Sequence, residues 1–309
     1  MRLLLLGANG QVGYELMRTL APLGELICAT RDKSGDASNA RRKVDLAEPD
    51  CLREALDAVA ADVVVNAAAY TAVDRAEDEP ELADCINHRA LAVIGNWAAA
   101  RRALVVHYST DYVFDGTATR PYGEDDAAAP LGVYGRSKLA GEIALRESHC
   151  AHLILRTAWV YAARGHNFLR TMLRLARERD ALSIVDDQRG APTTARLIAD
   201  VTATVLARVQ PKEKPVEPEL GHATYHLCAA GDCTWFEFAR AIFARAHAAG
   251  LIDHPIRLTP IATADYPTRA LRPAYSVLDT RKIRDTFGLD LPDWEHGLDA
   301  TIQELTTST

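Results

Sequence analysis

Two residues whose side chains could move a proton, Tyr134 and Lys138, lie four positions apart in the segment YGRSK. On a helix this spacing places the phenol and the ammonium group on one face. A cation some 4 Å from the phenol, at an effective dielectric of about 20, favours the phenolate by roughly 4 kcal/mol. We therefore expect Lys138 to lower the pKa of Tyr134 by about one to three units from its ordinary value of about 10, which suits a proton donor to a substrate oxygen.

A hydroxyl residue, Thr110, precedes this pair by 24 positions in the segment STDYVF. When hydride reaches a ketone carbon, negative charge grows on the oxygen, and hydrogen-bond donors must lie within reach of it. Thr110 is therefore predicted to orient a substrate carbonyl, a role that the neighbouring Ser109 could share. The alternative is a strand-end hydroxyl that bonds the local backbone.

The amino terminus carries three glycines at a three-residue spacing, Gly7, Gly10 and Gly13, directly after the apolar run Leu3 to Leu6. This pattern predicts a buried strand, a tight turn and a helix start, which together form a site for a dinucleotide pyrophosphate. The alternative is an ordinary surface turn. The amphipathic stretch Tyr14 to Leu20 that follows favours the dinucleotide site.

Length and composition place the chain among soluble α/β enzymes. It has 309 residues, of which 48% are hydrophobic, and a net charge of −7 that argues against nucleic acid as a partner. No apolar run reaches the roughly 18 residues of a membrane span, and we expect no membrane association. The six cysteines form no CxxC pair, which suits reduced thiols and a cytoplasmic location.

Apolar runs alternate with helical patterns, which predicts a doubly wound parallel sheet, a Rossmann-like α/β fold. The expected strands are Arg2–Leu6, Glu25–Thr30, Arg42–Val44, Asp62–Asn66, Ala103–Tyr108, His152–Thr157 and Tyr225–Cys228. The expected helices are Gln11–Leu20, Asp50–Ala60, Glu81–Arg102, Gly132–Ser148, Phe168–Arg179, Ala195–Val209 and Trp235–Ala249, the last capped by Thr234. Residues 186–194 are expected to form a polar turn, and residues 210–220 an exposed loop.

Two lobes are expected. A dinucleotide-binding domain would comprise residues 1–160 with part of 190–225, and a smaller, discontinuous substrate-binding lobe would comprise residues 161–189 and 226–309.

Five segments together carry a family resemblance: GANGQVG, NAAAYTAVDRAE from Asn66, STDYVFDG, YGRSK and RTAWVY from Arg156. With these segments the chain resembles an extended short-chain dehydrogenase/reductase, and the likeness continues through GAPTT to Arg272-Pro273. The resemblance implies transfer of hydride from a reduced nicotinamide to the C4 ketone of a dTDP-linked 4-keto-6-deoxyhexose, giving dTDP-L-rhamnose. Tyr134 would be the proton donor, and Lys138 would bind the nicotinamide ribose.

The same resemblance implies the binding residues. Those expected along the cofactor are Gly7, Gly10, Gln11, Val12, Gly13, Thr30, Arg31, Asp45, Leu46, Ala69, Tyr70, Thr71, Tyr108, Tyr134 and Lys138. Those expected on the substrate are Thr110, Asp111, Tyr112 and Trp159. Asp45 could instead be a turn or cap residue, and Trp159 could be a buried structural residue.

The second predicted strand ends at Thr30, which is followed by Arg31, and NAD enzymes usually place an acid at this strand end to bind the ribose hydroxyls. Without that carboxylate, a guanidinium can bind a 2′-phosphate, so NADPH is the expected donor. The neighbouring Asp32 keeps NADH open, and Arg31 could simply be a solvated loop charge.

Further expectations concern a metal ion, His107 and the assembly. Some relatives bind Mg²⁺, to which Glu15, Asp186 and Asp187 could contribute, although such acids are often only solvated. No catalytic metal is required, because Tyr134 supplies the proton. His107, within the fifth strand, is interpreted as a core residue whose hydrogen bonds are satisfied. A homodimer is the expected assembly.

Alternative functions remain open from the sequence. A nucleotide-sugar epimerase would share the Tyr-Lys pair, and a dehydratase usually has an Asp-Glu pair after the threonine, where this chain has Asp111-Tyr112. A regulatory subunit that binds dinucleotide without turnover would be marked by loss of the tyrosine or the lysine, and neither is lost.

Overall fold

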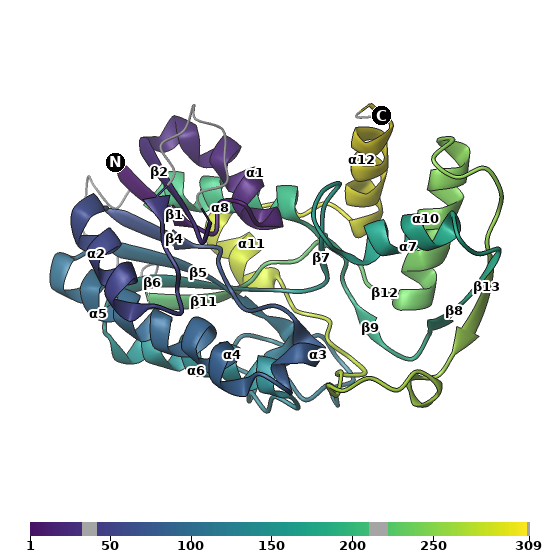
Figure 1. Cartoon of the computed structure of the whole chain (residues 1–309), viewed down its shortest axis with the longest axis horizontal. Coiled ribbons are helices and arrows are strands. Elements are labelled where there is room, and N and C mark those ends of the chain that lie inside the picture. The colour runs from purple at the N-terminus through teal and green to yellow at the C-terminus, as the bar shows by residue number, and fades with distance from the viewer. Residues whose placement is uncertain (33–41, 210–221, 308–309) are drawn as a thin grey trace.

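A computed structural model describes residues 1–32, 42–209 and 222–307. Its main feature is a seven-stranded, all-parallel sheet in the order β11-β6-β5-β4-β1-β2-β3 (Figure 1). The strands are β1 (Arg2–Leu6), β2 (Glu25–Thr30), β3 (Arg42–Lys43), β4 (Val63–Asn66), β5 (Leu104–Thr110), β6 (Ala151–Thr157) and β11 (His222–His226). From β1, the strands β2 and β3 are added on one side, and β4, β5, β6 and β11 are added on the other. In doubly wound sheets, ligands bind at the switch point between the two halves, here between β1 and β4.

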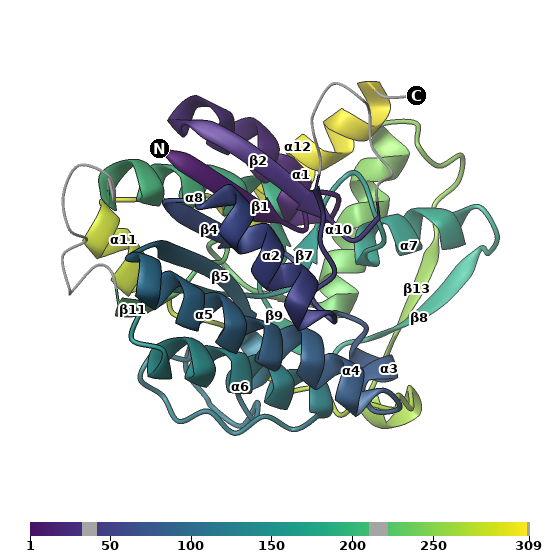
Figure 2. The ribbon, with the colours of Figure 1, turned by 60° about the vertical axis from the view of Figure 1, so that its left-hand side comes forward.

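Helices cover both faces of the sheet. One face packs against α1 (Gln11–Leu20), α8 (Ala195–Val209) and α11 (Arg281–Phe287), and the other against α2 (Pro49–Val59), α5 (Ala90–Arg101) and α6 (Val133–Glu147). Figure 2 shows α5 and α6 side by side along the sheet. Because both faces are covered, β4 and β5 are buried along their whole length, which explains their continuous apolar runs. The predicted Rossmann-like fold is confirmed.

A second group of elements lies beyond the carboxyl ends of the strands (Figure 1). It contains α7 (Phe168–Ala176), α10 (Trp235–Ala248) and α12 (Trp294–Thr307), which share a hydrophobic cluster of their own. A parallel pair, β8 (Ala181–Val185) and β13 (Arg257–Ile261), flanks this cluster. Residues Ile283, Phe287 and Leu291, by contrast, pack into the core of the main sheet.

Several predicted elements differ from the structure. The single helix expected over 81–102 is α4 (Pro80–Asp84), a π-helical turn (Cys85–Arg89) and α5. The strand expected at Tyr225–Cys228 lies earlier, as β11, because His222–His226 pairs in register with β6. The polar turn expected at 186–194 contains two short strands, β9 (Arg189–Gly190) and β10 (Thr193–Thr194). The loop expected at 210–220 lies outside the described residues.

Short remaining elements complete the chain: α3 (Val73–Ala76), β7 (Val160–Tyr161), which pairs with β10, and β12 (Cys233–Thr234), which pairs with β9. Within the described residues, no helix is long and apolar enough to cross a membrane. No disulfide joins any of the six cysteines, all of which lie within the described residues.

Candidate functional site

The glycine-rich turn joins β1 to α1 so tightly that side chains are excluded. Gly7 adopts a left-handed φ of +80°, and a Cβ at this position would lie 2.6 Å from the amide nitrogen of Ala68. A Cβ at Gly13 would lie 2.0 Å from the carbonyl oxygen of Gly7. Gly10 precedes α1 and no side chain caps the helix, so the first amide groups of α1 have no side-chain acceptor. This arrangement presents backbone donors to an anion.

Gln11 and Val12, the first residues of α1, are partly exposed at this turn. The side chain of Gln11 accepts a hydrogen bond from Asn167 Nδ2 at 2.7 Å, which links α1 to the segment before α7. Asn167 also caps α7 by accepting from the amide of Arg170 at 3.0 Å. The turn is therefore tied to the second group of elements.

The segment after β4 is fixed by a buried amide. Asn87 Oδ1 accepts from the backbone nitrogen of Tyr70 at 2.9 Å, and Asn87 Nδ2 donates to the Tyr70 carbonyl at 3.0 Å and to Ser137 Oγ at 3.0 Å. The Tyr70 hydroxyl donates to Glu79 at 2.8 Å. Ala69 is partly exposed and Thr71 is exposed, which leaves this segment open on one side.

Thr110 ends β5 with its side chain buried. Its hydroxyl accepts from the amide of Tyr112 at 3.2 Å and donates to Asp111 Oδ1 at 3.0 Å. The local backbone bond that the sequence left open is therefore made, and the hydroxyl also reaches a carboxylate. Burial raises the pKa of Asp111 to about 6, against hydrogen bonds from Ser276 and Thr110 that lower it.

Tyr134 lies in the first turn of α6, on the same helix as Lys138. Its ring meets Tyr112 edge to face, with centroids 5.6 Å apart. Burial raises the pKa of Tyr134 to about 12, although a hydrogen bond with Thr110 opposes this rise. The direction is opposite to the one expected from the Tyr-Lys spacing, because loss of hydration dominates and the Lys138 amine is bound elsewhere.

Lys138 is buried, with 2% of its surface exposed. Its Nζ donates to the carbonyl of Tyr108 at 2.6 Å and lies 3.1 Å from Nε2 of His107. Burial lowers the pKa of Lys138 to about 7, although the carboxylate of Glu142 raises it. His107 is fully buried with both ring nitrogens engaged, so the interpretation of His107 as a satisfied core residue is confirmed.

The Tyr108 side chain points to the other face of the sheet. Its hydroxyl is 2.8 Å from Thr202 Oγ1 of α8, and 8% of the residue is exposed. What Tyr108 offers to Lys138 is thus its carbonyl group.

Trp159 has a left-handed φ of 47°, which is strained for a residue with a Cβ. Its ring stacks on that of Trp235 with centroids 3.5 Å apart and planes 4° apart. Tyr112 lies on the other side of the site, close to Arg272, which pairs with Asp74 at 2.7 Å. The carboxyl-terminal tail is thereby tied to the segment after β4.

At the end of β2, Thr30 is buried and its hydroxyl donates to the Asp32 carbonyl at 2.5 Å, whereas Arg31 is exposed. Asp45 accepts from the amide of Ala47 at 3.0 Å, which is a local turn bond. The side chain of Leu46 belongs to the core. Among these four predicted residues, Arg31 is exposed and Asp45 is partly exposed.

The acids considered for Mg²⁺ do not gather. Glu15 lies 3.8 Å from both Arg18 and Arg196. Asp186 accepts from Thr234, and Asp187 from Thr263. Among residues 1–32, 42–209 and 222–307, no group of three or more His, Cys, Asp or Glu side chains is placed to hold a metal.

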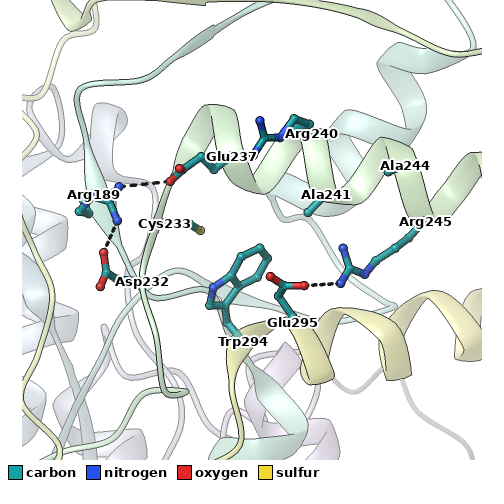
Figure 3. Close-up of a pocket in the computed structure, with 10 residues that line it drawn as sticks. All are labelled: Arg189, Asp232, Cys233, Glu237, Arg240, Ala241, Ala244, Arg245, Trp294 and Glu295. Carbon is teal, nitrogen blue, oxygen red and sulfur yellow. Dashed lines mark hydrogen bonds and ion pairs between the residues drawn. The ribbon is translucent and has the colours of Figure 1, made fainter.

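A cavity of about 510 Å³ lies apart from these residues, between β9, α10 and the start of α12 (Figure 3). Several of its charged groups are paired: Arg189 contacts Asp232 and Glu237, and Arg245 contacts Glu295 at 2.7 Å. The lining is Arg189, Asp232, Cys233, Glu237, Arg240, Ala241, Ala244, Arg245, Trp294 and Glu295. None of the residues predicted from the sequence to be catalytic or to bind cofactor or substrate lines this cavity.

The sequence analysis missed Asn66 and Asn87 as residues of this region. Each is a buried amide, Asn66 at the end of β4 and Asn87 in the π-helical turn. A buried amide must find hydrogen-bond partners, so an asparagine at the end of the apolar run VVVN is a signal that could have marked Asn66, whereas the polar segment CINHR gives no such signal for Asn87.

The whole chain is similar to known proteins. Residues 1–307 match the family model of the RmlD substrate binding domain. A dTDP-4-dehydrorhamnose reductase of Escherichia coli strain K12 is 46% identical over 312 residues, covering 100% of this chain and 99% of the relative. One from Burkholderia thailandensis is 46% identical, covering 99% of each.

A solved structure shares the fold. The dTDP-4-dehydrorhamnose reductase of Bacillus anthracis in complex with NADP is 31% identical, with a TM-score of 0.84 and coverage of 98% of this chain and 99% of that one. On both grounds, this chain belongs to the RmlD substrate binding domain family, together with the dTDP-4-dehydrorhamnose reductases.

Proposed function

We propose that the chain reduces the C4 ketone of dTDP-4-dehydro-L-rhamnose with NADPH to give dTDP-L-rhamnose, with Tyr134 as the proton donor. The observation that carries the proposal is the 46% identity, over the full length, to reductases of that name. Thr110, Tyr134 and Lys138, which a reductase of this kind needs, are all present and come from β5 and α6.

The residues at the strand ends fit a nicotinamide dinucleotide. The turn at Gly7, Gly10 and Gly13 leaves room for a pyrophosphate against uncapped amides of α1.

In the proposed mechanism, a reduced nicotinamide would, when bound, supply the hydride for the ketone carbon, and the residues of the chain act on the ketone oxygen. Thr110 donates a hydrogen bond to the carbonyl oxygen, turning away from Asp111. The raised pKa of Tyr134 keeps its phenol protonated at neutral pH, so the proton is available when charge develops on the oxygen. Lys138 in its charged form stabilises the phenolate that remains.

Several finer assignments rest on the same proposal. Arg31, exposed at the end of β2, would bind the 2′-phosphate, which favours NADPH over NADH. Trp159 and Asp111 would contact the dTDP-sugar.

Elements after β6 that share the α7–α10–α12 cluster would form the substrate lobe. Cysteines that form no disulfide suit a cytoplasmic location. A homodimer stays a prediction, which light scattering would check.

An epimerase or dehydratase is the main alternative. Asp111-Tyr112 replaces the Asp-Glu pair expected after the threonine of a dehydratase. A non-catalytic dinucleotide-binding subunit is disfavoured by the presence of both Tyr134 and Lys138.

The test is a coupled assay. Purified protein is incubated with dTDP-4-keto-6-deoxyglucose, the matching 3,5-epimerase and NADPH, and the nicotinamide absorbance is followed. We expect oxidation that depends on the epimerase. Oxidation at the same rate without the epimerase would reject the rhamnose assignment, and no oxidation in either case would reject the reductase.

A further inference from the structure

The side chains of Asn66, His107 and Lys138 form a hydrogen-bonded row beneath the candidate site. Asn66 of β4 is paired with His107 of β5 in the sheet register, and both are at most 1% exposed. Asn66 Nδ2 lies 3.3 Å from His107 Nδ1, and His107 Nε2 lies 3.1 Å from Lys138 Nζ. The row connects a fixed amide to the amine of the candidate site.

The direction of these hydrogen bonds follows from the partners. The backbone nitrogen of Ala68 lies 3.2 Å from Asn66 Oδ1 and can only donate, so the amide oxygen faces Ala68 and the NH₂ group faces His107. His107 Nδ1 must then accept, and the ring proton is on Nε2. This proton points at Lys138, and an ammonium group has no lone pair to receive it.

We propose that Asn66 and His107 set the charge of Lys138: Asn66 holds His107 as its Nε2–H tautomer, which pairs with the neutral amine of Lys138. His107 is then a positioning residue. To carry a charge, Lys138 needs the His107 proton to move to Nδ1, and the Asn66 amide must turn away from Ala68. Charging of Lys138 and the tautomer of His107 are therefore coupled.

The surroundings agree with a neutral amine. The acidic group facing Lys138 along α6 is Glu142, which is held by Arg156 Nε and Nη2 at 2.9 and 2.7 Å and by Arg146 at 2.7 Å. Its charge is thus largely compensated. Other ionisable groups near this end of the site are Tyr134 on α6, Tyr108 on β5 and Asp111 after β5. Burial of Lys138 itself acts in the same direction.

The inference deepens the proposed function, because Lys138 must be charged to stabilise the phenolate of Tyr134. Its direct test needs no turnover, so the two proposals can fail independently. Ring nitrogen shifts from ¹⁵N-histidine report the tautomer of His107, and ¹³C at lysine Cε reports the charge of Lys138 across a pH titration.

In the wild-type protein we expect the His107 proton on Nε2. Two variants change the coupling. In His107→Gln the side-chain oxygen is free to accept from an ammonium group, so the titration midpoint of Lys138 should rise by about one pH unit, the value of one hydrogen bond. In Asn66→Asp the carboxylate accepts from Nδ1, so the His107 proton should move to Nδ1.

The matched control is His152→Gln. His152 is buried in the adjacent strand β6 and bonds the Cys150 carbonyl at 2.8 Å, so its replacement should leave the Lys138 midpoint unchanged. If reductase activity is found, the pH dependence of kcat/KM gives a further readout. In His107→Gln, the fall of kcat/KM at basic pH should shift to higher pH together with the titration midpoint of Lys138. A proton on Nδ1 in the wild type, or a midpoint that does not move in His107→Gln, overturns the proposal. The tautomer in the wild type decides even if a variant fails to fold.

Discussion

The side-chain amide of Asn87 brackets the backbone of Tyr70, accepting from its nitrogen at 2.9 Å and donating to its carbonyl at 3.0 Å. Asn87 belongs to the π-helical turn between α4 and α5, so this single side chain joins that turn to the segment after β4. The extra residue of a π turn shifts the side chains that follow it, and π turns often occur at functional sites.

Replacing Asn87 with alanine should destabilise the protein. The substitution leaves two buried backbone groups of Tyr70 without partners, which costs about 3 kcal/mol. Urea unfolding followed by circular dichroism measures the change. Ser137→Ala removes one of the bonds of Asn87 and should cost about 1 kcal/mol; an equal loss in the two variants would contradict this account.

Tyr134→Phe should remove most turnover with little effect on dinucleotide affinity. The variant lacks the hydroxyl that is proposed to donate the proton, and general acids contribute about 10²- to 10⁴-fold to rates. Initial rates and fluorescence titration with NADPH separate the two effects. A variant with near-normal kcat would exclude Tyr134 as the acid.

Because of the Glu142–Arg156 pair, the free energy of unfolding should decrease as the pH falls into the acidic range. Burial alone would raise the pKa of Glu142, but the Arg156 guanidinium and its hydrogen bonds outweigh burial and lower it. A group with a depressed folded-state pKa contributes stability at higher pH that is lost as pH falls through that pKa.

Glu142→Gln tests this pair, because it leaves the Arg156 charge buried without a counter-ion. It should cost about 3 to 5 kcal/mol at pH 7. The cost should shrink as the pH falls below about 4.5, because the carboxyl is then protonated in the unfolded chain, and it should be smallest below the lowered pKa of Glu142 in the folded protein. Unfolding free energies at a series of pH values give the difference, and a constant difference down to pH 3 would contradict the assignment.

Arg31→Ala should weaken NADPH binding about tenfold and leave NADH binding nearly unchanged, because one charge-assisted hydrogen bond to the 2′-phosphate is lost. Arg31 is a cleaner target than Thr30, whose side chain is buried and already bonded to Asp32. Arg53→Ala, an exposed arginine on α2, is the control. Equal losses for both cofactors would remove Arg31 from phosphate recognition.

Local signals in the sequence were sufficient to predict most strands of the main sheet. The apolar runs of β1, β2, β4 and β6 and the spacing of Gly7, Gly10 and Gly13 depend on short-range geometry, and the predicted strands and turn follow them closely. The pair β8 and β13 was missed because their partners are more than 70 residues apart and neither strand is buried enough to show a clear apolar pattern. Elements of that kind are set by long-range pairing.

The sequence by itself determined the identities and order of the groups proposed to react, Thr110, Tyr134 and Lys138, together with the turn that suits a dinucleotide. Only the tertiary structure decided their protonation. Spacing on α6 brings the phenol and the amine to one face, but burial and the contacts of Lys138 with His107 and the Tyr108 carbonyl come from β5. Hydration and hydrogen-bond partners control a pKa, and both depend on which distant segments pack around the group.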